Sequence, residues 1–194
     1  MNTPNKLTLT RVLLVPLFVA LFYWYIPFHY LLATIIFLTA AVTDAIDGYL
    51  ARKNHLITDF GKFLDPLADK VLVVSALSCF LQQQRMHIAP FLLIVGREFM
   101  VSALRLVVAN KGTVVPASFA GKAKTAFTMA AIVAALLWQT FLFDFQLFGM
   151  QDTARLERIM DIVLAALFWI AAALTVWSGW EYLKAYWKDI NPNQ

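Results

Sequence analysis

The sequence predicts an all-α integral membrane protein with six transmembrane helices, and three features lead to this prediction. Of its 194 residues, 61% are hydrophobic and only 14% are charged, whereas soluble domains contain about 45–50% apolar and about 25% charged residues. The mean hydropathy is +0.69. Six apolar stretches fill nearly the whole chain, each close to the roughly 20 residues that a helix needs to cross a bilayer. We see no repeat or domain boundary and expect a single transmembrane domain over residues 1–194.

Turn signals separate the first three predicted helices. The first helix runs from about Leu7 to Ile26, and Pro27 closes it because proline disfavours a helical conformation in the residue before it. The second runs from about Tyr30 to Arg52. A polar segment, KNHLITDFGKF, then leads to a third helix from about Leu64 to Leu81.

Polar segments also separate the last three predicted helices. After QQQRMH, a fourth helix runs from about Ile88 to Asn110. The break KGTVVPASFAGKAK carries glycine, proline and lysine, which mark a connection. It precedes a fifth helix from about Thr125 to Leu142, and DFQLFGMQDTARLER separates that helix from a sixth, from about Ile159 to Tyr186.

Basic residues gather at alternate ends of these helices and predict the orientation of the chain. The residues on the basic side are Lys6, Arg11, Arg52, Lys53, Lys62, Lys70, Arg105, Lys111, Lys122, Lys124, Lys184 and Lys188. Only Arg85, Arg155 and Arg158 lie on the other side. The positive-inside rule therefore places both termini, the second-to-third loop and the fourth-to-fifth loop in the cytoplasm.

The net charge and the cysteine content exclude two other classes of protein. A net charge of +4 could indicate nucleic-acid binding, but membrane anchors at the helix ends explain it more simply, and we expect no nucleic-acid partner. The single cysteine, Cys79, cannot form an intramolecular disulfide, and its apolar surroundings are typical of a small buried side chain.

Two groups of carboxylates lie where lipid makes charge costly, and such residues are functional candidates. Five residues of the second helix fall within about 140° of one helical face. They are Asp44, Asp47, Gly48, Ala51 and Arg52. Asp65 and Asp69 form an i, i+4 pair at the start of the third helix. The short loop between the two helices allows the four carboxylates to converge.

Four carboxylates in a medium of low dielectric constant would repel one another unless a multivalent cation neutralised them. Oxygen ligands without cysteine or histidine favour Mg²⁺, Mn²⁺ or Ca²⁺. Two such ions about 3.5–4 Å apart typically serve displacement at phosphorus. Gly48 and Ala51 would let a ligand approach the helix closely. The alternative is that these small residues serve helix packing and that Arg52 is a membrane anchor.

The segment from Asp44 to Lys70 reads DAIDGYLARKNHLITDFGKFLDPLADK and matches D-x2-D-G-x2-A-R-x8-G-x3-D-x3-D at every fixed position. It resembles the signature of the CDP-alcohol phosphatidyltransferase family. The members are membrane enzymes with six transmembrane helices that transfer a phosphatidyl group from a CDP-linked lipid to an alcohol. The resemblance implies that the single domain is catalytic, with its active site facing the cytoplasm at the inner membrane.

The resemblance also implies roles for individual residues. Asp44, Asp47 and Asp65 would be metal ligands, and Asp69 would be a further ligand and the general base, with two Mg²⁺ or Mn²⁺ ions as the cofactor. Gly48 and Arg52 would contact the CDP moiety, since a guanidinium group suits phosphate recognition. The full set implied for the CDP-lipid is Asn5, Thr8, Gly48, Ala51, Arg52, Thr58 and Gly61. For Asn5 and Thr8, capping of the first helix is the alternative.

Three segments outside the signature resemble those of family members that use sn-glycerol 3-phosphate as acceptor, the phosphatidylglycerophosphate synthases. They are PNKLTLTR at Pro4–Arg11, GREFMVSALR at Gly96–Arg105 and GKAKT at Gly121–Thr125. A dianionic acceptor needs a basic pocket, and Glu98, Ser102 and Arg105 share one face of the fourth helix. The residues predicted to bind the acceptor phosphate are Arg97, Arg105, Lys122 and Lys124.

Alternative explanations stay open for several of these charged residues. Lys122 and Lys124 would also fit snorkelling at the membrane interface. Arg97 and Glu98 would fit a structural ion pair between helices. For Asp161, near the start of the last helix, we expect no catalytic role. It would satisfy the helix N-terminus or pair with Arg158.

Two other functions compete with this interpretation. A sibling enzyme would use another acceptor, such as phosphatidylglycerol for cardiolipin, inositol phosphate or serine. A divalent-cation transporter would also carry membrane carboxylates, but its site would lie near the bilayer midplane, often between repeated halves. The expected partners are CDP-diacylglycerol, sn-glycerol 3-phosphate and membrane lipids, and the sequence leaves a homodimer open.

Overall fold

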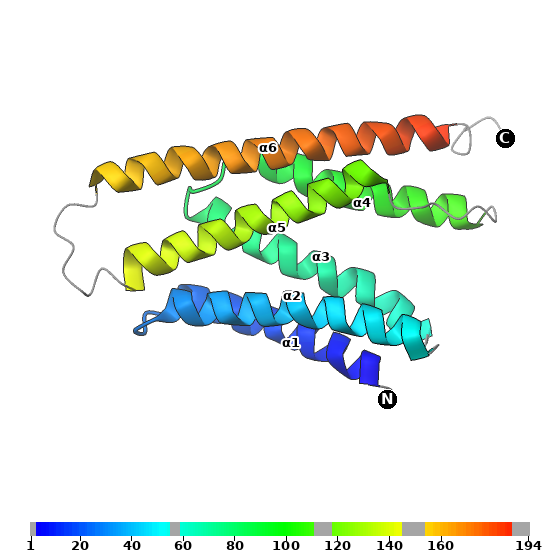
Figure 1. Ribbon diagram of the computed structural model, residues 1–194, viewed down its shortest axis with the longest axis horizontal. Helices are drawn as coiled ribbons and strands as arrows, with labels where there is room; N and C mark the ends of the chain where they lie inside the picture. Colours follow the sequence, from blue (N-terminus) through cyan, green and yellow to red (C-terminus); the bar gives the residue numbers. More distant parts are fainter. Residues whose placement is uncertain (1–2, 55–58, 111–117, 145–153, 188–194) are drawn as a thin grey trace. The chain divides into compact units, whose positions relative to one another are not determined.

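The structure, a computed structural model, describes residues 3–54, 59–110, 118–144 and 154–187 of the 194-residue chain. Over these residues it is all helical, without strands, as predicted (Figure 1). The helices are α1 (Thr3–Tyr23), α2 (His29–Asn54), α3 (Asp59–Gln82), α4 (Ile88–Asn110), α5 (Phe119–Gln139), a π-helix η1 (Thr140–Asp144) and α6 (Ala154–Tyr186).

Several helices are longer than the apolar stretches that predict them. α1 begins at Thr3, α3 at Asp59, α5 at Phe119 and α6 at Ala154. The segments DFGKF, FAGKAK and ARLER are therefore helical, and we were wrong to treat them as parts of connections. Glycine destabilises a helix by only about 1 kcal/mol relative to alanine, and lysine favours helix formation. Polar residues alone therefore do not end a helix.

The structure forms two compact units, and the first contains Met1–Phe80 and Ile132–Met160. In this unit α1 and α2 lie side by side (Figure 1). Aromatic side chains fill the space between its helices: the Phe22 ring lies 5.2 Å from that of Tyr30 and 5.7 Å from that of Phe80, and the Phe18 ring lies 5.7 Å from that of Phe37. These edge and tilted contacts are favourable geometries for buried aromatic rings.

The first turn of α2 is held by a carboxylate from far along the chain. Asp144, at the end of η1, is 2% exposed, and its Oδ2 accepts a hydrogen bond of 2.7 Å from the backbone N–H of Leu31. That N–H is among the first four of α2, which have no partner within the helix. A negative charge at a helix N-terminus is also favoured by the helix dipole. Asp144 therefore caps α2 from outside the helix.

The second unit contains Leu81–Ala131 and Asp161–Gln194, which include α4, the first part of α5 and most of α6. In the turn between α3 and α4, Arg85 forms an ion pair with Asp161 of α6. The expectation that Asp161 pairs with Arg158 or satisfies the start of its own helix is wrong. Arg85 lies far away in the sequence, and such a partner cannot be read from local spacing.

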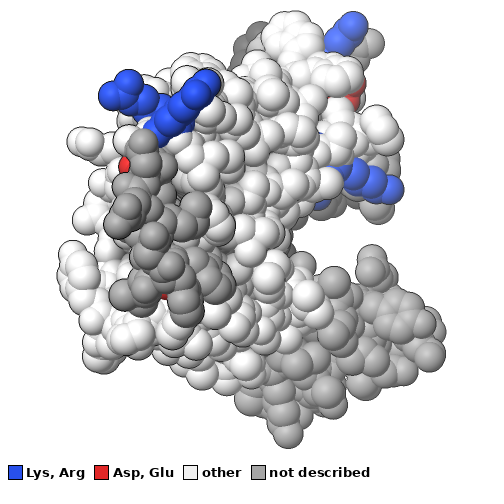
Figure 2. Space-filling view, turned by 60° about the vertical axis from the view of Figure 1, so that its left-hand side comes forward, with Lys and Arg blue, Asp and Glu red and all other residues white. Residues whose placement is uncertain are grey.

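The surface of these helices is that of a membrane protein. Large apolar side chains are exposed along them, such as Leu13 on α1 and Ile162 on α6, the latter 70% exposed. Apolar side chains exposed along several helices suit a surface that faces lipid. On the face shown in Figure 2, charged side chains of the described residues occupy a few separate places, and most of the surface that the described residues form is uncharged.

Within the part of the chain that the structure describes, two helical segments are long and apolar enough to cross a membrane, Phe119–Asp144 and Ala154–Tyr186. By length α4 would also suffice, since it has 23 residues. It differs because it carries three charged side chains, Arg97, Glu98 and Arg105. The charges that make α4 less apolar are the ones that build the site described next.

Candidate functional site

The backbone places the four predicted metal-binding aspartates on two helices. Asp44 and Asp47 belong to α2, and Asp65 and Asp69 belong to α3. Their side chains lie outside the described residues, as do those of the predicted CDP-lipid residues Asn5, Gly48, Ala51, Arg52, Thr58 and Gly61. Among the side chains that are described, no three or more histidine, cysteine, aspartate or glutamate residues form a group that could hold a metal. The all-oxygen donor set of these aspartates fits a hard divalent cation.

α1 contributes two buried polar side chains to the first unit. Thr8 is almost completely buried and Arg11 is completely buried, and both interact with surrounding groups. Because α1 begins at Thr3, neither Asn5 nor Thr8 caps this helix, and that alternative is wrong. The prediction that Arg11 is a membrane anchor is also wrong, because an anchor keeps its charged group exposed at the interface.

The described side chains of the second unit include four charged groups on α4 and α5 and a tyrosine on α6 that lie together, and we call these five residues the cationic cluster. Its members are Arg97, Glu98, Arg105, Lys124 and Tyr182. All five lie in the second unit. They come from three helices, so the cluster depends on tertiary packing and not on a local sequence motif.

Glu98 joins α4 to α5 in this cluster. Its Oε1 forms an ion pair with Nζ of Lys124 and lies 3.6 Å from Nη1 of Arg97. Lys124 is 4% exposed, so snorkelling is wrong for this residue, whereas Lys122 is exposed. A structural ion pair between helices is present, as one alternative proposed, but the partner of Glu98 on the other helix is Lys124.

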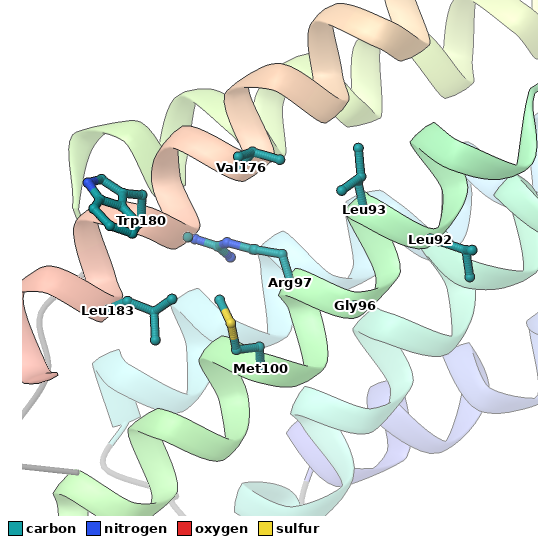
Figure 3. Close-up of a pocket in the computed structure, with 9 residues that line it drawn as sticks. Leu92, Leu93, Gly96, Arg97, Met100, Val176, Trp180 and Leu183 are labelled. Atoms are coloured by element: carbon teal, nitrogen blue, oxygen red, sulfur yellow. The ribbon is translucent and has the colours of Figure 1, made fainter. Parts of the chain in front are cut away.

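Arg97 reaches from α4 toward α6. Its Nη2 donates a hydrogen bond to Oγ of Ser178, and its guanidinium carbon lies 5.4 Å from the centre of the Tyr182 ring. The side chain is only 9% exposed. It borders a cavity of about 330 Å³ whose other walls are apolar residues of α4 and α6, among them Leu93, Met100 and Trp180 (Figure 3).

Arg105 contacts the same tyrosine from a position two turns further along α4. Its Nη2 donates a hydrogen bond of 2.8 Å to the Tyr182 hydroxyl, and its guanidinium carbon lies 5.2 Å from the ring centre. The backbone N–H of Ser118 donates to the same hydroxyl at 3.0 Å. Ser118 also caps α5, because its Oγ accepts a hydrogen bond from the N–H of Gly121.

Two glycines allow the side chains of the cluster to pack closely. A Cβ atom at Gly121 would lie 3.5 Å from the Tyr182 ring and 3.2 Å from Oγ of Ser118. A Cβ atom at Gly179 would lie 3.1 Å from Cγ of Arg97. In the sequence, Gly121 stands out only as part of the GKAKT segment. In the structure, the missing side chain of Gly121 leaves room for the Tyr182 ring.

Sequence reasoning missed Tyr182, Ser178 and Ser118. Ser178 and Tyr182 are four residues apart in the second half of α6, which places two polar groups on one face of the helix. That spacing is the signal that could have drawn attention to α6. Ser118, directly before an apolar helix, is of a type that favours the N-cap position.

The cationic cluster has an excess of positive charge. Arg97, Arg105 and Lys124 carry three cationic groups, and Glu98 carries the one carboxylate of the cluster. The Glu98 carboxylate forms its ion pair with Lys124. The charge around Tyr182 therefore comes mainly from the guanidinium groups of Arg97 and Arg105. Guanidinium groups suit phosphate through their paired N–H donors. The cluster can therefore attract an anionic phosphate group.

A membrane helix bundle with an aspartate signature across α2 and α3 defines a class of phosphatidyl-transferring enzymes. The family described as CDP-alcohol phosphatidyltransferase matches residues 1–177, and the chain belongs to this family. The resemblance seen in the signature is thereby confirmed.

Individual relatives match almost the whole chain. The CDP-diacylglycerol–glycerol-3-phosphate 3-phosphatidyltransferase of Bacillus subtilis (strain 168) is 41% identical over 201 residues, covering 97% of each chain. The enzyme of the same name from Haemophilus influenzae is 40% identical over 187 residues, covering 94% of this chain and 92% of its own. That of Rickettsia bellii is 38% identical over 184 residues, covering 95% and 94%.

Proposed function

We propose that this protein transfers the phosphatidyl group of CDP-diacylglycerol to sn-glycerol 3-phosphate, giving phosphatidylglycerophosphate and CMP. The observation that carries the proposal is the similarity over nearly the full length to relatives named for this reaction, at 38–41% identity. The prediction of a phosphatidyltransferase agrees with the family of the chain. The excess positive charge of the cationic cluster supports a phosphate-bearing acceptor.

The four aspartates of α2 and α3 are the proposed metal ligands. Asp44, Asp47, Asp65 and Asp69 offer only oxygen donors, which suits two Mg²⁺ or Mn²⁺ ions. When bound, these ions would supply positive charge beside the pyrophosphate of the lipid substrate. Around them we place the CDP-lipid contacts, which are Asn5, Thr8, Gly48, Ala51, Arg52, Thr58 and Gly61.

Asp69 is the proposed general base. Its carboxylate takes the proton from the primary hydroxyl of glycerol 3-phosphate. The hydroxyl oxygen then attacks the lipid-side phosphorus, the bond from that phosphorus to the CMP oxygen breaks, and CMP leaves. Arg52 would hold a phosphate oxygen of the CDP group, because its N–H donors match phosphate geometry.

Arg97, Arg105, Lys122 and Lys124 form the proposed binding site for the acceptor phosphate. Their roles differ according to their surroundings. Arg105 is exposed and Arg97 borders a cavity, so these two guanidinium groups are the proposed direct contacts. Lys122 is exposed at the start of α5 and adds charge nearby. Lys124 is buried against Glu98, and its ion pair neutralises the carboxylate that would otherwise repel the acceptor phosphate.

The proposed arrangement in the cell follows from the distribution of charge. We infer that all six helices cross the inner membrane within a single catalytic domain, with the active site facing the cytoplasm. The basic ends of the helices and the positive-inside rule support this orientation. A cytoplasmic site would give water-soluble glycerol 3-phosphate direct access to a lipid substrate that stays in the bilayer.

An acceptor panel tests the proposed reaction. The purified protein in mixed micelles with Mg²⁺ or Mn²⁺ and CDP-diacylglycerol should release CMP with glycerol 3-phosphate. It should release far less with serine, inositol phosphate or phosphatidylglycerol. Release of CMP only with one of these other alcohols would make it a sibling enzyme. Cation flux into liposomes without lipid substrate would favour a transporter.

Asp69→Asn tests the proposed base. We expect CMP release to fall by at least about 100-fold, because general base catalysis contributes roughly 10²–10⁴-fold. Asp152→Asn, in the polar segment before α6, is the matched control and should keep the wild-type rate. Full activity in Asp69→Asn would rule out this mechanism.

A further inference from the structure

We propose that Tyr182 is a positioning residue for the acceptor phosphate, holding the guanidinium groups of Arg97 and Arg105 where they bind it. The inference rests on the proposed function and adds a residue of α6 to a site otherwise built on α4 and α5. Tyr182 is 3% exposed, so it acts through the two arginines and does not itself contact the substrate.

Tyr182 is where the contacts of the cationic cluster meet. The guanidinium carbons of Arg97 and Arg105 lie 5.4 and 5.2 Å from the centre of its ring, within the distance of about 6 Å at which a cation is attracted to an aromatic ring. Its hydroxyl accepts hydrogen bonds from Nη2 of Arg105 and from the backbone N–H of Ser118. One side chain thus joins α6 to α4 and to the first turn of α5.

The two guanidinium groups need a residue that keeps them near its ring, because electrostatic forces would otherwise move them away from Tyr182. Their like charges repel each other, and because the Arg97 side chain is only 9% exposed, water screens this repulsion incompletely. Glu98 would also attract them, and its Oε1 is already 3.6 Å from Nη1 of Arg97. The Tyr182 ring is attractive to cations without adding a negative charge. Both guanidinium groups can therefore stay close to the Tyr182 ring while their positive charge remains available to a dianion.

The surroundings of Tyr182 hold its ring in place. Gly121 allows the ring to pack against α5, since a Cβ atom there would lie 3.5 Å from both Cε2 and the hydroxyl oxygen of Tyr182. The hydrogen bond from Ser118 fixes the hydroxyl relative to the start of α5. Lys122 and Lys124 follow within the next two turns of this helix. Tyr182 thereby aligns the cations of α4 with those of α5.

Steady-state kinetics of Tyr182→Phe test the inference. This variant keeps the ring but loses the acceptor for Arg105, and a hydrogen bond to a charged group is a strong one. We expect KM for glycerol 3-phosphate to rise about tenfold, with KM for CDP-diacylglycerol and kcat within about twofold of wild type. The inhibition constant of inorganic phosphate, competing with the acceptor, should rise by the same factor. Tyr182→Leu, which also removes the ring, should raise both constants further.

Tyr186→Phe is the matched control, because Tyr186 lies one turn further along α6 and is partly exposed. It should leave both KM values unchanged. A purely structural role for Tyr182 would lower the amount of active enzyme and leave KM for the acceptor at the wild-type value, which would overturn the inference.

The wild type separates this inference from the proposed function. If the wild type releases no CMP with glycerol 3-phosphate, the proposed function fails, and the inference fails with it. If the wild type uses glycerol 3-phosphate and Tyr182→Phe has an unchanged KM for it, the inference alone fails. Should Tyr182→Leu yield no folded protein, Tyr182→Phe decides the question.

Discussion

Glu98 carries the only carboxylate of the cationic cluster, and Lys124 is buried against it. Breaking a buried ion pair by removing one partner leaves a charge without compensation, which typically costs about 3–5 kcal/mol. We therefore predict that Glu98→Gln and Lys124→Met each lower the apparent melting temperature in detergent. The double variant should lose less stability than the two single variants lose together, because it contains neither of the two buried charges.

Arg155→Gln is the control for this cycle. Arg155 is exposed in the first turn of α6, outside the cationic cluster, and its substitution should cost less than about 1 kcal/mol of stability, as is usual for exposed charges. Strictly additive losses in the double variant would show that Glu98 and Lys124 are not coupled.

At the scale of single residues, the sequence predicted cations better than the groups that hold them. Arg97 and Arg105 stand out because charge is rare in an apolar helix. Tyr182 does not stand out, since tyrosines near the ends of membrane helices are usually interface residues. Its contacts come from residues 60 to 90 positions earlier in the chain. Such pairings depend on packing, which no local pattern contains.

The two glycines that border the cavity on α4 and α6 differ in what surrounds them. A Cβ atom at Gly179 would lie 3.1 Å from Cγ of Arg97 and 3.3 Å from Cε of Met100, whereas one at Gly96 would meet nothing within 4 Å. The stem of Arg97 cannot retreat freely, because its guanidinium group is held by Ser178 and Tyr182. Close packing of α4 against α6 therefore requires a glycine only at position 179.

We predict that Gly179→Ala lowers the apparent melting temperature and raises KM for glycerol 3-phosphate a few-fold by displacing Arg97. Gly96→Ala is its control. It should leave KM unchanged and slightly raise stability, since alanine favours a helix by up to about 1 kcal/mol over glycine. Thermal unfolding in detergent and acceptor titrations provide both measurements. Equal effects of the two substitutions would contradict the packing argument.

At the scale of helices, apolar stretches located the elements but not their ends. Hydrophobicity marks the part of a helix that suits lipid, whereas the helix itself ends where backbone hydrogen bonds end. α3 and α5 begin five or six residues before their apolar stretches, and the cap at Ser118 accounts for the start of α5. The capping of α2 by Asp144 could not be predicted, because the two lie 113 residues apart.

The whole molecule has one cysteine, Cys79, and it is buried, which makes the proposed orientation testable by labelling. Two single-cysteine variants can be made in a Cys79→Ala background. His87→Cys introduces a cysteine at the exposed turn before α4, and Lys184→Cys introduces one in the exposed last turn of α6. We predict that a membrane-impermeant maleimide labels His87→Cys from outside the inner membrane. It should label Lys184→Cys only after permeabilisation. Labelling of both positions from the same side would contradict the topology.

At the scale of the whole molecule, the family could be predicted from the sequence because its signature lies within one short segment. Eight fixed residues between Asp44 and Asp69 led to the family that the chain belongs to. Carboxylates within membrane helices are rare because they are costly. The four aspartates of the signature are therefore easy to recognise in a chain with few charges. The proposed acceptor site is instead assembled from three helices, and there the sequence predicted the cationic residues but not their geometry.

The bond between Asp144 and Leu31 has a consequence for synthesis of the chain. A ribosome adds about 5–20 residues per second, so the 113 residues between the two partners delay the cap on the order of ten seconds after Leu31 emerges. During that interval the first turn of α2 must find other partners for its N–H groups, such as water or lipid headgroups. The nascent helix that carries Asp44 and Asp47 thus gains the cap on its first turn only after α5 and η1 have been synthesised.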